Sequence, residues 1–537
     1  MRLTAQAAGE TIAAAVEAGV TVFDTARAYE HNERMLADAL RGRTGLRVVT
    51  KGGMSRPGGA WVADGRARAI RADCEASLAA LDGVGIDLYL LHVPDPRTPW
   101  RASVRALAKL VDDGVVARVG VANVNRGQLD EALELAPVTA VQVPLSVFDE
   151  RALRGGLLER CEEAGVAVIA HSPLGGPRRA RTLVRRPDLV DLAEAHRATP
   201  AEVALARVLS LSPNVVAIPG AGRPESVRSA VRAASIVLDR PTRRVARRPS
   251  RSGAEVVLVM GIPGAGKSRL AAGYAGRGYV RLNRDERGGS LRGLAAELDE
   301  RLGSGDASVV LDNTYLTRAS RSYVVEAAGR HGVAARCLWL DTPLAQAQVN
   351  LVERLLDRFG GLPTPAELRA AARGEQGLLL PTSQMRAVRE LEPPSLDEGF
   401  SEVVTQPFVR EPSQRPGRGV FVAAAALSTP GWNEAVAAAD PRAPHLVFDW
   451  REGGSVEDLD DCLAQLAAVV SGPVAAATCV HGGGPPVCWC RPPLPGLPLA
   501  FAREHDVDPA SSVVVGCRPA HRTLAAALGA GYVASSV

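Results

Sequence analysis

The stretch GIPGAGKS, residues 261–268, has the residue types and spacing that point most directly to chemistry. It follows the apolar run VVLVM, so the pattern G-x-x-x-x-G-K-S predicts a glycine-rich loop between a buried strand and a helix. In such a loop backbone N–H groups cradle phosphates, Lys267 reaches the β- and γ-oxygens, and Ser268 holds magnesium. The pattern therefore predicts a site for a nucleoside triphosphate, ATP with Mg²⁺. The glycines of this loop are Gly261, Gly264 and Gly266.

Four further positions are candidates for phosphoryl transfer. Asp285, in YVRLNRDERGG, should follow a second strand, where its carboxylate could accept the proton of an attacking hydroxyl. Asp312, in SVVLDNTYLTRASR, should end a third strand, the place of a magnesium-binding aspartate. Arg354 and Arg358 lie on a predicted helix that ends at Gly-Gly-Leu-Pro. They either stabilise charge on the transferred group from a lid helix or form a solvated helix face. We therefore expect a kinase that phosphorylates a hydroxyl.

A second set of polar residues lies in the first 240 residues, at the ends of strand-like stretches. Asp24, Lys51 and His92 each end one stretch, and Tyr29 follows Asp24 in FDTARAY. A buried Asp–Lys pair can lower the pKa of a neighbouring tyrosine, because the cation favours the phenolate. The tyrosine can then act as general acid toward a carbonyl oxygen, while His92 orients the substrate. Each residue alone could be a satisfied polar group, but their order at successive strand ends favours a catalytic set.

The stretches that end in these residues are continuous apolar runs, typical of parallel strands buried on both faces. Helical periods lie between them, such as Arg66–Leu81 and Arg101–Asp112. With Met1–Leu3 as the end of one more strand, the pattern predicts a (β/α)₈ TIM barrel with its site at the carboxyl ends of the strands. The other predicted strands are Val22–Thr25, Val48–Lys51, Leu88–His92, Val119–Asn123, Val141–Leu145, Val166–His171 and Val215–Ile218.

Cysteine and histidine cluster near the carboxyl end of the sequence. Cys479-x-His481 and Cys488-x-Cys490 offer four soft or borderline ligands, separated by a Gly/Pro turn. This spacing predicts a structural Zn²⁺ site, because four protein ligands leave no open position for water. Unligated cysteines are the alternative. Eight cysteines in 537 residues form no disulfide framework, which favours a reducing cytoplasm.

Two stretches rich in arginine, proline and glycine divide the chain, RRVARRPSRSG and REPSQRPGRG. The first is either a solvated basic tether or an aid for a phosphate-rich ligand. They predict α/β domains at 1–240, 255–410 and 419–537, joined by linkers at 241–254 and 411–418. The net charge of +4 does not by itself argue for nucleic acid or membrane. No apolar run of about 18 residues occurs, so no membrane span is expected.

The first 236 residues resemble the aldo/keto reductase family, in FDTARAY, VVTKGG, DLYLLH, VGVANVN, AHSPLGG and AIPGAGRPESV. The resemblance implies a barrel, NADPH as cofactor, a small-molecule carbonyl substrate, and the four residues of the catalytic set as a tetrad. It also implies that Asn123 and Gln142 hold the nicotinamide carboxamide. Only the end of the family's first strand is present, and the segment after Tyr29 is short. Further matches to cofactor and phosphate contacts are Ser172, Leu174, Gly220 and Arg223.

Residues 255–410 resemble the P-loop kinase module of polynucleotide 5′-kinase/3′-phosphatases, most specifically in NRD, DNT and EPPSLDEGF. The resemblance implies Asp285 as general base, Arg354 or Arg358 as lid arginine, and a nucleic-acid 5′-hydroxyl end as acceptor. A zeta-toxin-like small-molecule kinase is the competing interpretation. The stretch lacks the alternating basic and aromatic residues of a single-strand-binding groove.

Residues 419–537 resemble haloacid-dehalogenase-type phosphatases, Rossmann-like α/β proteins whose histidinol-phosphate and heptose-bisphosphate members carry the same zinc loop. The catalytic residues are missing: GVFVAAAALS has no Asp-x-Asp pair, Pro492 replaces a lysine, and Cys517 replaces a magnesium-binding aspartate. Asp449 is a lone strand carboxylate. Without a nucleophile no phosphoaspartate can form, so we expect an inactive domain.

The patterns together predict a bifunctional cytoplasmic enzyme, an NADPH-dependent carbonyl reductase joined to an ATP-dependent kinase. The alternative is a nucleic-acid-repair or scaffold protein with an active small-molecule kinase and an inactive barrel.

Overall fold

The computed structural model describes residues 4–238, 254–305, 308–375, 377–410 and 413–535. The chain divides into two compact units, Met1–Arg244 and Val245–Val537. The predicted linker at 241–254 lies outside the described residues except for Ala254. Among the described residues, no helix is both long and apolar enough to cross a membrane.

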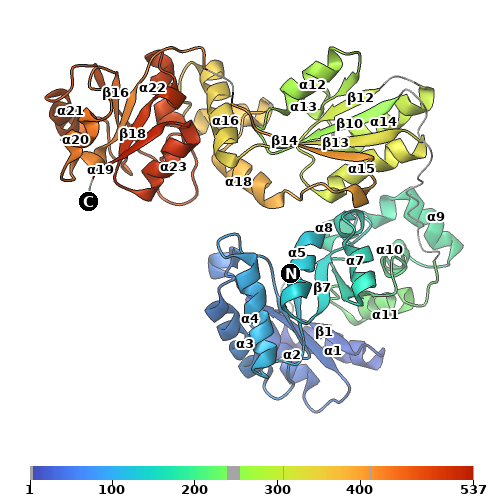
Figure 1. Ribbon diagram of the computed structural model, residues 1–537. Helices are drawn as coiled ribbons and strands as arrows, with labels where there is room; N and C mark the ends of the chain where they lie inside the picture. The colour runs from blue at the N-terminus through green and yellow to red at the C-terminus, as the bar shows by residue number, and fades with distance from the viewer. Residues whose placement is uncertain (1–3, 239–253, 306–307, 376, 411–412, 536–537) are drawn as a thin grey trace. The chain divides into compact units, whose positions relative to one another are not determined.

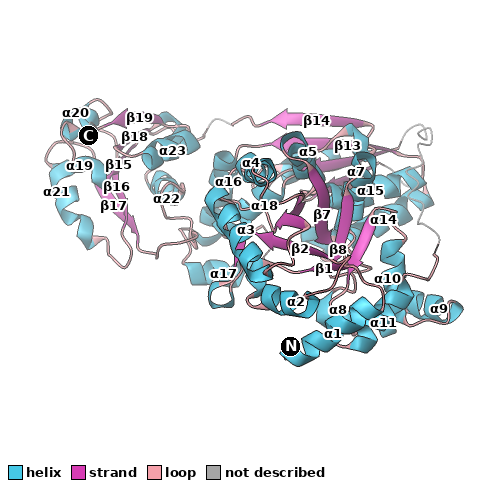
Figure 2. Ribbon diagram, turned by 90° about the horizontal axis from the view of Figure 1, so that it is seen from below, coloured by secondary structure: helices cyan, strands magenta, loops and turns pink. Residues whose placement is uncertain are grey.

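The first unit is a curved parallel sheet with helices on its outer side (Figures 1 and 2). The strand order is β1-β2-β5-β6-β7-β8-β9, and every pairing is parallel. The strands in the middle of the sheet, such as β5 and β6, are completely buried, whereas the edge strands β1 and β9 are partly exposed. The strands are β1 (Val22–Asp24), β2 (Arg47–Gly52), β5 (Leu88–Leu91), β6 (Val119–Ala122), β7 (Val138–Pro144), β8 (Ala167–His171) and β9 (Val215–Ile218).

This sheet is a nearly closed barrel. Its edge strands in the described residues are β1 and β9, and the expected eighth strand at Met1–Leu3 lies outside those residues. The first and last helices of the unit, α1 and α11, pack against each other across the two edges. The longer helices are α1 (Ala5–Glu17), α2 (Asn32–Leu40), α3 (Ala67–Leu81), α4 (Trp100–Asp112), α5 (Arg126–Leu135), α7 (Leu157–Ala164), α9 (Pro187–Ala195), α10 (Pro200–Leu209) and α11 (Pro224–Ala233).

The second unit contains two parallel five-stranded sheets (Figure 1). The first has the order β11-β12-β10-β13-β14, so the strand before the glycine-rich loop is central. Its strands are β10 (Glu255–Met260), β11 (Val280–Leu282), β12 (Val309–Asp312), β13 (Ala334–Asp341) and β14 (Glu402–Pro407). Its helices are α12 (Lys267–Ala275), α13 (Arg284–Arg287), α14 (Leu291–Ser304), α15 (Arg318–Arg330), α16 (Leu344–Phe359), α17 (Pro365–Gly374) and α18 (Pro381–Glu390).

The other sheet belongs to residues 413–535, called the C-terminal module below. Its order is β17-β16-β15-β18-β19, with the strand nearest the expected nucleophile position, β15, in the centre. The strands are β15 (Val420–Ala423), β16 (His445–Trp450), β17 (Val474–Cys479), β18 (Val513–Gly516) and β19 (Gly531–Ala534). The helices are α19 (Ala424–Leu427), α20 (Trp432–Ala437), α21 (Asp460–Ala467), α22 (Gly496–Glu504) and α23 (Pro519–Leu528).

Helix α16 lies between these two sheets (Figure 1) and packs against α22 and α23. Its side chains Leu351, Val352 and Leu355 belong to one buried cluster with the core of the C-terminal module. Helix α16, which the sequence predicted as a lid, is therefore packed inside the second unit, because its apolar face is buried in the core shared with the C-terminal module. The described part of the predicted second linker also makes contacts, since Arg415 pairs with Glu353 of α16 at 3.1 Å.

Candidate functional sites

The first candidate site lies at the carboxyl ends of the barrel strands. Asp24 ends β1 and Lys51 lies in β2, and parallel pairing brings the two side chains together. Lys51 Nζ donates to Asp24 Oδ2 at 2.7 Å and to the carbonyl oxygen of Thr25 at 2.8 Å. The lysine side chain is 1% exposed and the aspartate side chain 10% exposed. This pair is therefore buried and charge-compensated, as the sequence predicted.

Tyr29 and His92 meet above this pair. The Tyr29 ring lies 5.7 Å from Lys51 Nζ and makes an edge contact with the His92 ring at a centroid distance of 5.8 Å. Burial, followed by the nearby Lys51 charge, lowers the pKa of His92 to about 4, so its imidazole is neutral at pH 7. The ring atom His92 Nδ1 is buried and has no hydrogen-bond partner among the described residues.

The expectation of a lowered tyrosine pKa is wrong. Burial, followed by the Asp24 carboxylate, raises the pKa of Tyr29 to about 12. The physical reason is that Asp24 compensates the charge of Lys51, so the phenol loses water without gaining a net cation. Burial also lowers the pKa of Lys51 despite its contact with Asp24. Tyr29 therefore keeps its proton at neutral pH, as a general acid must.

Trp61 is a residue of this site that sequence reasoning missed. It lies between η2 (Pro57–Gly59) and β4 (Val62–Ala63), in the hairpin that follows β2. Its ring is 6.2 Å from the Tyr29 ring and 6.1 Å from the His92 ring, and it is 51% exposed. Trp61 therefore forms an apolar wall beside Tyr29. A tryptophan shortly after the strand that carries Lys51 was the available signal.

The residues expected to hold a carboxamide lie on the neighbouring strands. Gln142 in β7 donates from Nε2 to Asp24 Oδ1 at 2.7 Å, and Asn123, after β6, donates from Nδ2 to the carbonyl oxygen of His92 at 2.9 Å. Asn123 Oδ1 also lies 3.2 Å from Nε2 of His171, whose pKa burial lowers. The two amide side chains are therefore hydrogen-bonded to Asp24 and to the backbone of His92, contacts that the sequence spacing alone did not reveal.

Two residues with an unfavourable backbone conformation lie at the same carboxyl edge of the sheet. Asn123 and Ser172, which follow β6 and β8, have φ angles of 58° and 52°, in the left-handed region that side chains seldom adopt. Leu174 is partly buried in a nearby apolar cluster. Gly220 and Arg223 follow β9 and are exposed, with Arg223 at the start of α11. All the residues predicted for this site thus lie at the carboxyl edge of the sheet or in the loops that follow it.

The second candidate site is the glycine-rich loop between β10 and α12. Five consecutive carbonyl oxygens of this loop accept hydrogen bonds from side chains. Lys267 donates to Gly261 and Ile262, Gln384 to Pro263, Asn350 to Gly264, and Thr342 to Ala265, over 2.8–3.1 Å. The backbone N–H of Gly261 donates to the carbonyl oxygen of Thr314 at 3.4 Å and that of Ala265 to Ile262 at 3.1 Å, which leaves the N–H groups of Gly264 and Gly266 to face a ligand. A loop held in this way can bind an anion through its backbone N–H groups.

Gly264 and Gly266 of this loop have φ angles of 86° and 95°, which glycine adopts without strain. A Cβ atom on Gly264 would lie 2.3 Å from the carbonyl oxygen of Ala347, so α16 leaves room for glycine only. Burial lowers the pKa of Lys267 to about 8, against the opposing effect of Asp312. The negative charge of bound phosphates would stabilise the protonated Lys267 side chain.

Asp312 is placed as predicted, at the end of β12, but its partner was not predicted. Arg281 in β11 holds both carboxylate oxygens, with Nε–Oδ1 at 3.0 Å and NH2–Oδ2 at 2.7 Å. The Asp312 side chain is fully buried. The guanidinium charge opposes direct contact between this carboxylate and a magnesium ion. The ion pair with Arg281 therefore disfavours the predicted role of Asp312 as a magnesium ligand.

Asp285 lies on the short helix α13, which Asn283 positions. Asn283 Oδ1 accepts from the backbone N–H of Asp285 at 2.6 Å, and its Nδ2 donates to the carbonyl oxygen of Asp312 at 2.8 Å. Asn313 accepts from the backbone N–H of Arg284 at 3.1 Å. The asparagines of NRD and DNT therefore fix the helix, and the Asp285 side chain stays 49% exposed, open to an acceptor.

The two arginines of α16 differ in their surroundings. Arg354 lines a cleft beside the glycine-rich loop and donates to the carbonyl oxygen of Gly377 at 3.2 Å. Arg358 is exposed and pairs with Glu375. Arg354 also acts electrostatically on Lys267. The arrangement therefore favours Arg354 over Arg358 as the arginine of the site.

The motif EPPSLDEGF has a structural function within the second unit. Glu398 receives two hydrogen bonds from Arg321, at 2.7 and 2.6 Å, and both side chains are buried. The same guanidinium donates to the carbonyl oxygens of Tyr315 and Glu392. This network joins the segment after β12 to the segment before β14.

Cys479, His481, Cys488 and Cys490 form one cluster whose ligand atoms all lie within 4.8 Å of one another. Cys479 Sγ is 3.5 Å from His481 Nδ1 and 3.6 Å from Cys488 Sγ, and Cys490 Sγ is 3.3 Å from His481 Nδ1. Tetrahedral zinc bonds of about 2.0–2.3 Å require ligand separations of about 3.5 Å. The four residues can therefore hold one metal ion.

The phosphatase-like positions carry no catalytic pair. The last residue of β15 and the residue after it are alanines, Ala423 and Ala424, both buried. Asp449 in β16 pairs with Arg451 at 2.9 Å, and Cys517 follows β18.

Comparison with known proteins gives matches in both units. Residues 1–242 match the model of the Aldo/keto reductase family, and residues 256–378 match a model described as AAA domain. Aldo-keto reductase str7 of Strobilurus tenacellus is 31% identical over 258 residues, which cover 42% of this chain and 75% of that protein. Probable aldo-keto reductase 1 of Glycine max is 32% identical over 233 residues, covering 38% and 67%. A solved aldo-keto reductase of Klebsiella pneumoniae in complex with NADPH is 29% identical, with a TM-score of 0.39, covering 44% and 81%.

Proposed function

Because the chain belongs to the aldo/keto reductase family through its first 242 residues, we propose that its first unit reduces a small-molecule carbonyl compound with NADPH. The observation that carries this proposal is the convergence of Tyr29 and His92 on the buried Asp24–Lys51 pair. When bound, NADPH supplies the hydride. Tyr29, protonated at neutral pH, donates its proton to the carbonyl oxygen, and Lys51 stabilises the phenolate that remains. Neutral His92 orients the substrate.

The residues present fit this cofactor. The strained backbone at Asn123 and Ser172 and the unpartnered His92 Nδ1 lie at the edge where the nicotinamide would meet the substrate. Asn123 and Gln142 would hold the carboxamide, and the exposed Arg223 is available for a 2′-phosphate. Ser172, Leu174 and Gly220 complete the proposed contacts.

A calorimetric titration of the folded chain tests this proposal. NADPH should bind more tightly than NADH, and Arg223→Ala should reduce the difference, because a guanidinium group can pair with the extra phosphate. Folded protein that binds neither cofactor would favour the alternative, a repair or scaffold protein with an inactive barrel.

A second function is supported by the hydrogen bonds that hold the glycine-rich loop. We propose that the second unit is an ATP-dependent kinase that phosphorylates a hydroxyl, with Asp285 as general base. The loop N–H groups and Lys267 would bind the phosphates, Ser268 would contact Mg²⁺, and Arg354 would stabilise the transferred group. A nucleic-acid 5′-hydroxyl end and a small-molecule hydroxyl are the competing acceptors. Transfer from labelled ATP to 5′-hydroxyl DNA, RNA, nucleosides and sugars distinguishes them.

We further propose that the Cys/His cluster holds a structural zinc ion and that the C-terminal module is an inactive phosphatase-like domain. The parallel sheet with β15 at its centre supports the resemblance, and alanines at the nucleophile position support the loss of activity. The purified chain should therefore release no phosphate from 3′-phosphate ends or sugar phosphates.

A further inference from the structure

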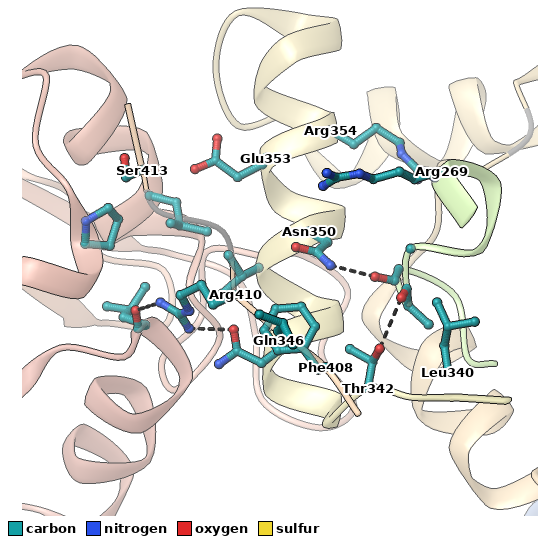
Figure 3. A pocket seen from close by; sticks show the side chains of 18 of the residues that line it. Arg269, Leu340, Thr342, Gln346, Asn350, Glu353, Arg354, Phe408, Arg410 and Ser413 are labelled. Atoms are coloured by element: carbon teal, nitrogen blue, oxygen red, sulfur yellow. Dashed lines mark hydrogen bonds between the residues drawn. The ribbon is translucent and has the colours of Figure 1, made fainter. Parts of the chain in front are cut away.

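A large cleft in the second unit begins at the glycine-rich loop and ends at the C-terminal module (Figure 3). Its volume is about 1160 Å³. Gly264, Ala265 and Gly266 form one end, together with Gly273 of α12. Residues of α16 form the side, and Leu499, Asp506 and Asp508 of the C-terminal module form the other end. A ligand whose phosphates occupy the loop can therefore extend to the C-terminal module.

Charged side chains line both ends of the cleft. Figure 3 shows the side chains of Arg269 and Arg354 at the end next to the loop. The opposite end has two carboxylates, Asp506 and Asp508, but Arg410 and Arg415 line it as well, and Phe408 contributes an aromatic surface to the wall. Guanidinium groups attract phosphates, whereas carboxylates repel them and accept hydrogen bonds from hydroxyl and amino groups. The cleft thus suits a molecule that is anionic at the loop end and carries both donors and acceptors of hydrogen bonds at the other end.

The wall formed by the C-terminal module is held in place. Arg410, after β14, donates to the carbonyl oxygens of Ala527 and Leu528 and to the side chain of Gln346. Gln346 in turn donates to the carbonyl oxygen of Ala527 at 3.0 Å. With the shared core around α16, these bonds fix the distance between the loop and the far carboxylates.

We propose that this cleft receives the nucleoside half of the nucleoside triphosphate, so that the C-terminal module forms part of the nucleotide site. This rests on the kinase proposed above. Arg354, the arginine proposed for the transferred group, lies at the loop end of the cleft, so the phosphates lie at that end and the nucleoside extends from there. An acceptor hydroxyl must reach Asp285, which does not line the cleft. A base and a ribose, which carry both donors and acceptors, can bond to the carboxylates and the guanidinium groups of the far end.

The proposal is tested by comparing the binding of ATP with that of inorganic tripolyphosphate, using calorimetry on the full chain. Gly273→Trp fills the cleft from α12, where a Cβ atom meets nothing within 4 Å, and Gly273→Ala is its matched control. Asp506→Lys removes a hydrogen-bond acceptor at the opposite end. Glu504→Lys makes the same charge change on an exposed residue two positions away that does not line the cleft.

Gly273→Trp and Asp506→Lys should each weaken ATP about tenfold or more and leave tripolyphosphate within about twofold of the wild type. The two controls should bind both ligands like the wild type. Unchanged ATP binding in Asp506→Lys, or equal weakening of both ligands in Gly273→Trp, overturns the inference while the kinase proposal stands. If Gly273→Trp or Asp506→Lys loses the binding of a 5′-hydroxyl oligonucleotide but keeps that of ATP, the cleft holds the acceptor, and the inference is also overturned. If the wild type binds neither ATP nor tripolyphosphate, the kinase proposal itself fails.

Discussion

The indole Nε1 of Trp489 donates a hydrogen bond to the carbonyl oxygen of Leu379, at 2.8 Å. Trp489 is 3% exposed and lies between two residues of the metal cluster, Cys488 and Cys490. Leu379 lies just before α18, whose Gln384 holds the carbonyl oxygen of Pro263 in the glycine-rich loop. The Cys/His cluster and the glycine-rich loop are therefore joined through one tryptophan and one helix.

Loss of the metal should accordingly destabilise the second unit. The purified chain should contain about one zinc ion, and Cys488→Ser should release it and lower the thermal stability, because metal binding is coupled to folding. Trp489→Phe should keep the zinc and cost about 1 kcal/mol, since it removes only the indole hydrogen bond. Metal analysis and thermal unfolding measure both effects. Protein purified without chelator that contains no zinc would contradict the assignment.

Tyr29→Phe should abolish most carbonyl reduction and preserve NADPH binding. The phenylalanine retains the ring contact with His92 but lacks the proton donor, so kcat should fall about 100-fold or more. Because the pKa of Tyr29 is about 12, its ionisation should cause no loss of wild-type activity between pH 7 and about 10. Steady-state kinetics across this range provide the check, and a variant with the wild-type kcat would exclude Tyr29 as the donor.

The first unit should lose stability as the pH falls from about 6.5 toward 4. The unfolded chain protonates His92 near its ordinary pKa of about 6.5, whereas the folded chain protonates it only near 4. The unfolded state therefore binds more protons in this window, and the free energy of unfolding falls by about 3 kcal/mol once both states are protonated. Denaturant unfolding at several pH values measures this loss. His92→Gln should flatten the profile, and an unchanged profile would show that the imidazole is not buried and neutral.

If the second unit is the proposed kinase, Lys267→Ala should abolish ATP turnover, and Asp285→Ala should bind ATP without transferring phosphate, because only the proposed base is removed. Arg354→Ala should lower kcat about 100-fold, since it removes a donor to the transferred group. Arg358→Ala is the matched control, because Arg358 pairs with Glu375 on the exposed face. Transfer from labelled ATP is the measurement. Wild-type transfer by the Asp285 variant, or equal loss in both arginine variants, would contradict these roles.

Glu398→Gln should destabilise the second unit by about 3–5 kcal/mol, because it leaves the buried Arg321 guanidinium without its counter-charge. Asp397→Asn in the same motif should cost at most about 1 kcal/mol, since the Asp397 side chain is 49% exposed where it pairs with Arg318. Denaturant unfolding compares the two variants. Similar costs for both would mean that EPPSLDEGF is not a stabilising motif.

The sequence by itself determined the features that depend on local spacing. The glycine-rich loop, the polar residues at successive strand ends and the Cys/His cluster each follow from a short pattern with a direct backbone consequence. The buried apolar runs likewise determined the parallel strands of the barrel.

The tertiary structure alone decided which distant side chains meet, because burial and charge pairing depend on elements far apart in the chain. It paired Asp312 with Arg281, distinguished Arg354 from Arg358, and raised rather than lowered the pKa of Tyr29. It also placed α16 inside a core shared with the C-terminal module. No periodicity within α16 could reveal this, since an amphipathic helix shows that one face is buried but not which module buries it.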